Sequence, residues 1–352
     1  MKKLKEFKIG NKKVGGNNSC FIIAEMSGNH NQSYKKAIEI IDAAAKAGVD
    51  AIKLQTFKPE EHTIDCDNDY FQVKVNDAWR GETLYNLYKK VYTPWEWQPK
   101  LIKYANSKGL ICFSSPGHIS AIDFLQRLNV PAYKVASFEI VDPAFLTRLG
   151  KTKKPVIISR GMASIADISF AVKTLRKAGC PHIIVLHCVS SYPAKLEQMN
   201  VHTVPDIAKR FNVVSGLSDH SLGITASVAA VALGASVIEK HFTLRRSDGG
   251  PDAEFSLEPH EMKELVQAVR DTEKALGKVS YNIGKREAEN IVFRRSLFVV
   301  EDIKKREKFT KENVKSIRPG YGLPPKELSK VLGKKAKKDI VRGTPLSKKL
   351  IT

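Results

Sequence analysis

The chain has 352 residues, and 58 Lys and Arg against 37 Asp and Glu give it a formal net charge of +21. Hydrophobic residues make up 42% and charged residues 27%, as in folded soluble proteins, which excludes global disorder. No run approaches the roughly 18 consecutive apolar residues that a membrane span needs, so we expect no membrane association.

The five cysteines are scattered and none forms a Cys-x-x-Cys pair, which argues against a disulfide framework and against a cysteine zinc site. The first residues are basic but include no apolar core and no cleavage site of a secretory signal. We therefore expect a reduced, cytoplasmic protein.

Short apolar runs alternate with helical patterns from residue 21 to about 280. The helical patterns at 35–50, 168–179 and 224–235 place apolar residues at helical spacing and end near glycine. Eight strand–helix units in this length predict a (β/α)8 TIM barrel over 1–280, and no Gly-x-Gly-x-x-Gly follows the first strand to favour a doubly wound sheet. The eight predicted strands are 21–25, 51–55, 110–115, 132–137, 155–159, 182–188, 213–218 and 236–241.

The second and third strands are separated by an insert, 56–99, that is rich in tyrosine and tryptophan. A long loop on the catalytic face of a barrel is often a lid or a partner contact. Its aromatic residues can equally pack into a local core, and both interpretations stay open.

Near residue 285 the alternation ends, and prolines and glycines follow. We predict a linker over 281–291 and a small β-rich domain over 292–352. Residues 290–352 hold 18 Lys and Arg and six Asp and Glu, and therefore +12 of the net charge. Such a surface can contact nucleic-acid phosphates, but without a recognisable motif we favour a solvated surface or a field that attracts an anionic substrate, and we expect no nucleic-acid partner.

Polar residues gather where the predicted strands end, and in a barrel these ends face the active site. A single serine there can cap a helix and a single histidine can be a core residue, but eight strands ending in this way point to a functional site. The polar residues are Glu25, Lys53, Gln55, Ser115, Lys134, Ser137, Glu139, Ser159, His187, Ser190, Ser218, Asp219, His220, Glu239, Lys240 and His241.

Three chemical groupings follow from these residues. Lys53 and Lys134, with serines at neighbouring strand ends, can form a cradle for phosphate or carboxylate oxygens. His220 and His241, on the last two strands, can share a divalent ion such as Mn²⁺, Mg²⁺, Co²⁺ or Zn²⁺. Glu25 ends the first strand, which adjoins the last after closure, and can ligate that ion or act as general acid or base.

The sequence resembles the sialic acid synthase (nonulosonate synthase) family over nearly its whole length. The resemblance implies a TIM barrel followed by a small antifreeze-like (SAF) domain, in a domain-swapped homodimer. It also implies that phosphoenolpyruvate condenses with an acylated amino sugar and that phosphate is released. The segments that carry it are IAEMSGNHNQS (23–33), AIKLQTF (51–57), YKVASFE (133–139), ISRGMAS (158–164), LHCVSSYPA (186–194), GLSDHS (216–221), IEKHFTL (238–244), GGPDAEFSLEP (249–259) and RPGYG (318–322).

Within the family the segments at 26–33, 114–118 and 190–192 are most similar to pseudaminic acid synthases. This similarity implies 2,4-diacetamido-2,4,6-trideoxy-β-L-altropyranose as the acceptor and pseudaminic acid as the product. The alternatives are an N-acetylneuraminate or legionaminate synthase, using N-acetylmannosamine or a diacetamido-trideoxy-mannose, and a non-catalytic carbohydrate- or nucleic-acid-binding protein.

The resemblance also implies roles for individual residues. Glu25 and Glu139 are the candidate acid/base residues, and His220 and His241 hold a catalytic divalent metal, with Mn²⁺ expected first and Mg²⁺ or Co²⁺ as alternatives. Arg318 reaches the sugar from the SAF domain of the partner subunit. The residues implied for phosphoenolpyruvate are Lys53, Lys134, Ser137, Ser159, Ser190 and Ser218, and those implied for the sugar are Gln55, Ser115, Tyr192, Asp252 and Arg318.

Overall fold

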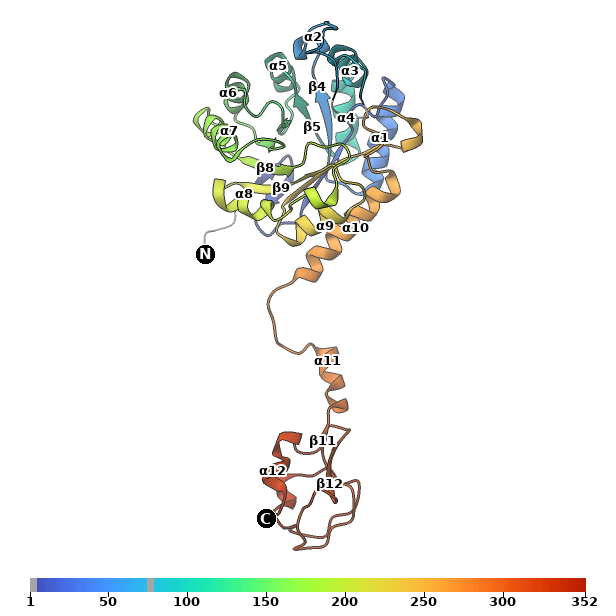
Figure 1. Cartoon of the computed structure of the whole chain (residues 1–352), viewed down its shortest axis with the longest axis vertical. Helices are drawn as coiled ribbons and strands as arrows, with labels where there is room; N and C mark the ends of the chain where they lie inside the picture. The colour runs from blue at the N-terminus through green and yellow to red at the C-terminus, as the bar shows by residue number, and fades with distance from the viewer. Residues whose placement is uncertain (1–4, 75–78) are drawn as a thin grey trace. The chain divides into compact units, whose positions relative to one another are not determined.

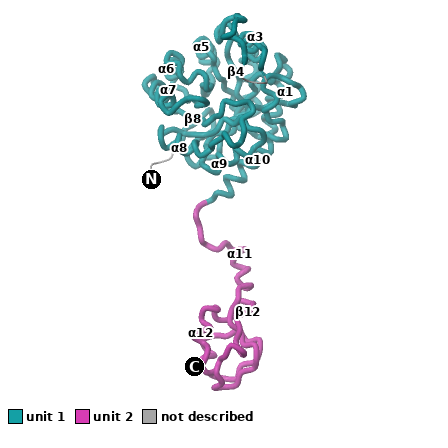
Figure 2. The backbone as a smooth tube through the Cα atoms, viewed as in Figure 1, with its two compact units in different colours: residues 1–277 teal, residues 278–352 magenta. Residues whose placement is uncertain are grey.

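The computed structural model describes residues 5–74 and 79–352. The chain divides into two compact units, 1–277 and 278–352, which are coloured separately in Figure 2. The first unit is a closed barrel of eight strands surrounded by helices (Figure 1). The predicted TIM barrel is therefore confirmed.

The barrel strands follow one another in chain order, and every neighbouring pair is parallel. The ring closes between the last strand and the first, where His241 pairs with Glu25. The strands are β3 (Phe21–Glu25), β4 (Ala51–Thr56), β5 (Ile111–Pro116), β6 (Tyr133–Val135), β7 (Val156–Ser159), β8 (Ile183–Cys188), β9 (Val214–Asp219) and β10 (Val237–His241).

Helices connect these strands and cover the outside of the barrel. Their ends carry the expected signals, such as the Ser33 side chain capping the first long helix and Gly48 ending it in the left-handed region. They are α1 (Tyr34–Ala47), α4 (Gln98–Ser107), α5 (Ile119–Arg127), α6 (Pro143–Lys151), α7 (Ile165–Lys177), α8 (Thr203–Phe211), α9 (Thr225–Ala232) and α10 (Pro259–Leu276), with 3₁₀ turns at Leu196–Gln198 and Arg246–Asp248.

Strand alternation sorts the side chains into two cores. In β10, Ile238 belongs to the large cluster between strands and helices, whereas Val237 belongs to a smaller cluster inside the barrel. Residues two positions apart on a strand share one side of the barrel wall. Glu239 and His241 therefore share the inner side with Val237, and Lys240 shares the helix side with Ile238.

A hairpin that the sequence analysis did not anticipate precedes the barrel. It pairs β1 (Glu6–Ile9) with β2 (Lys12–Gly15) in antiparallel register. Its buried Ile9 and Val14 join the inner cluster together with the first residues of barrel strands, such as Phe21. The hairpin thus closes the end of the barrel opposite to the carboxyl ends of the strands.

The insert 56–99 contains α2 (Pro59–His62) and α3 (Leu84–Val91). Buried Phe57, Leu87 and Val91 form a separate small cluster with four half-buried residues, Val73, Trp79, Tyr88 and Tyr92. The local core that was one interpretation of the insert is therefore present in its described part, while the lid or partner role stays a prediction.

The second unit has its own core, which includes Leu297, Phe309 and Leu346. Its regular strands are short, β11 (Ser296–Val299) and β12 (Val314–Ile317), and isolated bridges extend their pairing. The unit also contains α11 (Lys285–Glu289), which lies in the predicted linker, α12 (Leu328–Val331), and 3₁₀ turns at Asn290–Phe293, Pro325–Glu327 and Lys348–Leu350.

All five cysteines are free thiols in this structure, and four of them are buried. Within residues 5–74 and 79–352, none of the helices has the length and apolar character required to cross a bilayer.

The buried ion pair on the helix side of β10 gives a prediction about stability. Lys240 Nζ lies 2.9 Å from Asp219 Oδ2, and both side chains are fully buried. Lys240→Met leaves the carboxylate without its cation and should lower the free energy of unfolding by about 3–5 kcal/mol. Urea unfolding followed by the fluorescence of the three tryptophans, all in the barrel unit, measures this change.

The matched control is the exposed pair of Arg210 and Asp206 on α8. Arg210→Met should cost less than about 1 kcal/mol. Equal losses in the two variants would contradict a structural role for the buried pair.

Candidate active site

The carboxyl ends of the strands open into one cavity of about 1280 Å³. Every residue of the barrel unit to which the sequence analysis gave a catalytic or binding role lines this cavity. Arg318 belongs to the second unit, where its side chain is exposed. The lining residues are Glu25, Lys53, Gln55, Ser115, Lys134, Ser137, Glu139, Ser159, Ser190, Tyr192, Ser218, His220, His241 and Asp252.

Two buried lysines meet one carboxylate at the floor of the cavity. Glu239 Oε2 lies 3.0 Å from Lys53 Nζ, and Glu239 Oε1 lies 3.2 Å from Lys134 Nζ. Ser218 Oγ donates to Glu239 Oε1 at 2.9 Å. Lys53 also pairs with Glu25 at 2.5 Å, so the lysines are held in place before any ligand binds.

The protonation states follow from burial and from this charge arrangement. Burial lowers the pKa of Lys53 to about 7. Burial alone would raise the pKa of the Glu239 carboxyl, but Lys134 and Lys53 outweigh it and hold that pKa well below its usual range. Glu239 is therefore ionised at neutral pH, whereas Lys53 loses its proton near neutral pH.

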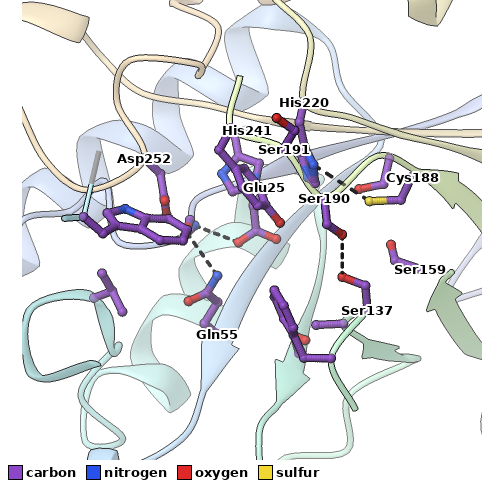
Figure 3. Close-up of a pocket in the computed structure, with 18 of the residues that line it drawn as sticks. Glu25, Gln55, Ser137, Ser159, Cys188, Ser190, Ser191, His220, His241 and Asp252 are labelled. Carbon is purple, nitrogen blue, oxygen red and sulfur yellow. Dashed lines mark hydrogen bonds between the residues drawn. The ribbon is translucent and has the colours of Figure 1, made fainter. Parts of the chain in front are cut away.

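Hydroxyl groups lie on one side of this centre. Ser137 Oγ and Ser190 Oγ are 3.1 Å apart and share a hydrogen bond, which Figure 3 shows. Ser159 Oγ is buried and has no hydrogen-bond partner. Hydroxyls beside two lysines form the donor set that oxyanions require, so this side of the cavity is suited to phosphate or carboxylate.

A different set lies on the other side of Glu25 in the view of Figure 3, where Gln55 and Asp252 are found. Gln55 Nε2 donates to Ser27 Oγ at 3.0 Å, and Ser27 Oγ donates to Asp252 Oδ2. Burial raises the pKa of Asp252, while the Ser27 hydrogen bond acts in the opposite direction. These groups can hydrogen-bond hydroxyl and amide groups of a neutral ligand.

The insert 56–99 supplies an apolar wall to the same cavity. Leu84, Leu87 and Val91 line it, as does Trp79, whose indole N–H donates to Pro251 O at 2.8 Å. The Trp79 ring lies 5.5 Å from that of Tyr192. The insert is therefore attached to the loop that carries Asp252, on the side suited to a neutral ligand.

His220 and His241 lie side by side, with ring centroids 5.4 Å apart. His220 Nδ1 is 2.9 Å from Val189 O, and when it donates to this carbonyl it leaves Nε2 as the free ligand atom. His241 Nδ1 is buried without a partner. Burial, with the charges of His220 and Lys53, keeps the pKa of His241 well below its usual value, so its ring is neutral.

These neighbouring imidazoles could supply two of the ligands of a divalent metal. Two imidazoles are available, and no group of three or more His, Cys, Asp or Glu residues arranged to hold a metal occurs in the described part of the chain. Burial disfavours a charged His220, but Cys188, Val189 and Glu239 raise its pKa, so a metal would compete with a proton at this ring.

Three of the polar residues at the strand ends do not reach the cavity, because they lie on the helix side of the wall. Asp219 pairs with Lys240, and His187 is fully buried, with Arg160 Nε donating to its Nδ1 at 3.0 Å. The alternation of inward and outward residues along β8, β9 and β10 could have identified all three from the sequence.

Sequence reasoning gave no role to three residues that are central to the observed site. Glu239 joins the two lysines, Ser27 joins Gln55 to Asp252, and Cys188 lines the cavity 3.8 Å from His220 Nδ1. Glu239 shares the inward register of His241, which was an available signal. Ser27 follows its strand in a turn with positive φ, which no periodic pattern predicts.

Comparisons with known proteins agree with this architecture. Residues 40–281 match the NeuB family, and residues 294–352 match the SAF domain, which confirms the expected C-terminal module. The chain is 45% identical to a pseudaminic acid synthase of Campylobacter jejuni subsp. jejuni, over 93% of this chain and 95% of the relative. It is 35% identical to the N,N'-diacetyllegionaminic acid synthase of Legionella pneumophila, over 96% of each chain.

A solved structure shares the fold. The N-acetylneuraminic acid synthetase of Leptospira borgpetersenii superposes with a TM-score of 0.73 at 33% identity, covering 83% of this chain and 97% of that one.

The low pKa of Lys53 gives a prediction about anion binding. Sulfate keeps its charge near neutral pH, so a change in its affinity with pH reports a change in the charge of the cavity. Between about pH 6 and pH 8 the dissociation constant should rise by about tenfold, because Lys53 loses its proton as the pH passes its pKa of about 7. Isothermal titration calorimetry measures this change.

Lys53→Arg is the matched variant, because its guanidinium stays charged throughout. It should bind sulfate with a weaker pH dependence than the wild-type protein. A wild-type affinity that is constant over this pH range would contradict the role assigned to Lys53.

Proposed function

The chain belongs to the NeuB family of nonulosonate synthases, and we propose that it condenses phosphoenolpyruvate with 2,4-diacetamido-2,4,6-trideoxy-β-L-altropyranose and water to give pseudaminic acid and phosphate. The observation that carries this proposal is the division of the cavity. Fixed cations and serine hydroxyls lie on one side, and neutral hydrogen-bonding groups with an apolar wall lie on the other.

Phosphoenolpyruvate matches the cationic side. Lys53 and Lys134 supply the positive charge that its phosphate and carboxylate need, and Ser137, Ser159 and Ser190 supply hydroxyl donors. Because Glu239 already holds both lysines, the cavity is arranged for an anion in advance. Ser218 acts on the anion site indirectly, because its hydroxyl donates a hydrogen bond to Glu239.

In the proposed reaction, C3 of phosphoenolpyruvate uses its enol electrons to form a bond with the aldehyde carbon of the open-chain sugar, whose oxygen takes up a proton. Water adds to C2 and gives up a proton. The bond between C2 and the phosphate oxygen then breaks as the C2 carbonyl forms, and phosphate leaves. Glu25 borders the floor lysines and is our candidate to orient the water, while Glu139 is the second acid/base candidate.

We propose that His220 and His241 hold a divalent metal, Mn²⁺ first and Mg²⁺ or Co²⁺ as alternatives. When bound, such an ion is a Lewis acid that polarises a carbonyl oxygen. The rings themselves are positioned by the protein, since Val189 O holds His220 and the Phe255 ring lies 4.9 Å from that of His241.

The wall of Leu84, Leu87 and Val91 supports a deoxygenated acceptor. A 6-deoxy sugar presents a methyl group to an apolar surface, whereas N-acetylmannosamine would place a hydroxyl group there without a partner. Gln55, Asp252, Tyr192 and Ser115 are the candidate contacts for the polar groups of the sugar. The greater identity to a pseudaminic acid synthase than to the legionaminic acid synthase supports the same acceptor.

We further propose that the chain forms a domain-swapped homodimer in the cytoplasm, in which Arg318 contacts the sugar at the partner's site. Arg318 is exposed on a unit with a large positive charge, which supports a contact outside its own unit.

The acceptor is tested by a phosphate-release assay with three sugars. Release should require phosphoenolpyruvate, a divalent metal and the sugar together. The altrose-configured substrate should have a higher kcat/KM than either N-acetylmannosamine or the diacetamido-trideoxy-mannose. Its advantage over N-acetylmannosamine should be about 10- to 100-fold, because an apolar wall rejects a hydroxyl group only moderately. Equal rates with all three sugars would contradict the proposed acceptor.

The metal site is tested by chelation and by one substitution. Chelation should abolish phosphate release, and added Mn²⁺ should restore it. His241→Ala should weaken Mn²⁺ binding, measured by calorimetry without substrates, by about 100-fold or more. The control is the exposed His202, whose replacement by alanine should leave Mn²⁺ affinity unchanged. Full Mn²⁺ affinity in His241→Ala would overturn the metal assignment.

A further inference from the structure

Three residues of the cavity meet at Ser27, in the turn that follows β3. Ser27 Oγ accepts a hydrogen bond from Gln55 Nε2 at 3.0 Å and donates one to Asp252 Oδ2. The backbone N–H of Ser27 donates to Glu25 Oε1 at 2.7 Å. Figure 3 shows Glu25, Gln55 and Asp252 around this part of the cavity. One buried residue therefore contacts the acid/base candidate through its main chain and two candidate sugar ligands through its hydroxyl.

The chemistry of the hydroxyl fixes the direction of these hydrogen bonds. An ionised Asp252 carboxylate only accepts, so it takes the single proton of the hydroxyl, whose oxygen is then left to accept from Gln55. Gln55 must turn its amide nitrogen toward Ser27, which leaves its carbonyl oxygen as the acceptor for a ligand. Because the hydroxyl proton is already used within the protein, Ser27 acts on a ligand through its two neighbours.

The backbone conformation of Ser27 separates the hydroxyl from the needs of the turn. Its φ of +49° lies in the left-handed region, which glycine adopts freely and other residues adopt with strain. Glycine would also supply the same N–H to Glu25. What serine adds at this position is its hydroxyl, so the strain is accompanied by a hydrogen-bonding group and not by a better turn.

The main chain that carries Asp252 is held without this hydroxyl. Asn29 Nδ2 donates to Ser256 Oγ at 2.9 Å, and Ser256 Oγ donates to the backbone oxygen of Asp252 at 2.5 Å. The loop after β10 therefore stays attached to the turn after β3 when the Ser27 hydroxyl is removed. The hydroxyl acts on the side chains of Gln55 and Asp252, and these line the cavity.

We propose that Ser27 is a positioning residue for the acceptor sugar. Its hydroxyl orients the Gln55 carbonyl oxygen to accept from the N–H of an acetamido group, and the Asp252 carboxylate to accept from a sugar hydroxyl group. This inference rests on the proposed function, to which it adds a residue that serves the sugar alone. The lysines of the cationic side are held by Glu239, so binding of phosphoenolpyruvate should not depend on the Ser27 hydroxyl.

The kinetic test is Ser27→Gly, which removes the hydroxyl but keeps the N–H that holds Glu25. For whichever of the three candidate sugars supports the fastest phosphate release, KM should rise by about tenfold, because two of its ligands lose their orientation. The KM for phosphoenolpyruvate and kcat should each change by less than about threefold. Ser27→Ala, which keeps the Cβ, should give the same rise. A wild-type KM for the sugar in both variants would overturn the proposal.

A stability measurement separates positioning from a general effect on the turn. Ser27→Gly relieves the left-handed strain, so its urea midpoint should be no lower than that of the wild-type protein. The matched control is Ser33→Ala, which removes the cap of α1 from the same connection. It should unfold at a lower urea concentration and keep the wild-type KM for the sugar. An equal rise in the sugar KM in Ser33→Ala would show that loosening of the turn is the cause, and the proposal would be wrong.

The hydrogen-bond chain is also tested without turnover, by NMR of the Gln55 side-chain amide. Its two N–H signals should shift in Ser27→Gly and stay unchanged in Ser33→Ala. Identical signals in the wild-type protein and in Ser27→Gly would refute the inference, whatever the enzyme catalyses. If the signals shift and the sugar KM rises, but with a sugar other than the altrose-configured one, the positioning role holds and only the proposed acceptor is wrong.

Discussion

The site depends on one carboxylate, Glu239, which allows two lysines to be buried side by side. Without it, Lys53 and Lys134 would repel each other in a poorly solvated cavity, and nothing would offset the effect of burial, which favours the neutral form of Lys53. With it, the two ammonium groups are held close together in the cavity, where the oxygens of an incoming anion can reach both of them. The surrounding residues follow from this constraint: Ser218 fixes one oxygen of the carboxylate, and Glu25 shares the charge of Lys53. The apolar core of the barrel lies beneath these groups, and its low dielectric constant strengthens their ion pairs and hydrogen bonds.

The barrel also explains how residues distant in sequence meet. Glu25 and His241 are more than 200 positions apart in the sequence, yet they are opposite each other in the strand pairing that closes the ring. Hydroxyl groups come from the ends of β7 and from loops after β6 and β8, while the insert after β4 contributes the opposite side. The cavity therefore has a cationic side and a neutral side because different arcs of the same ring supply them.

Much of the fold and of the site could be predicted from the sequence, and there are physical reasons why the other features could not. The eight strands were recognisable because parallel strands buried on both faces are short, continuous apolar runs, and their ends identified Lys53, Lys134 and His241. The hairpin β1–β2 was not recognised, since its exposed lysines hide the two inward residues Ile9 and Val14. The inward direction of Glu239 could be read from strand alternation, but its pairing with two lysines depends on which strands meet in the closed ring. The apolar wall depends on the fold of an irregular insert, which no local pattern predicts.

The apolar wall comes from a single contiguous stretch of chain between β4 and α4, whereas the lysines and serines of the cationic side are distributed over several strands of the ring. Such an arrangement is modular in an evolutionary sense. One recombination event within that stretch could replace the apolar wall while leaving the cationic side of the cavity intact. Members of a lineage could in this way change what the neutral side of the cavity admits without rebuilding the cationic side.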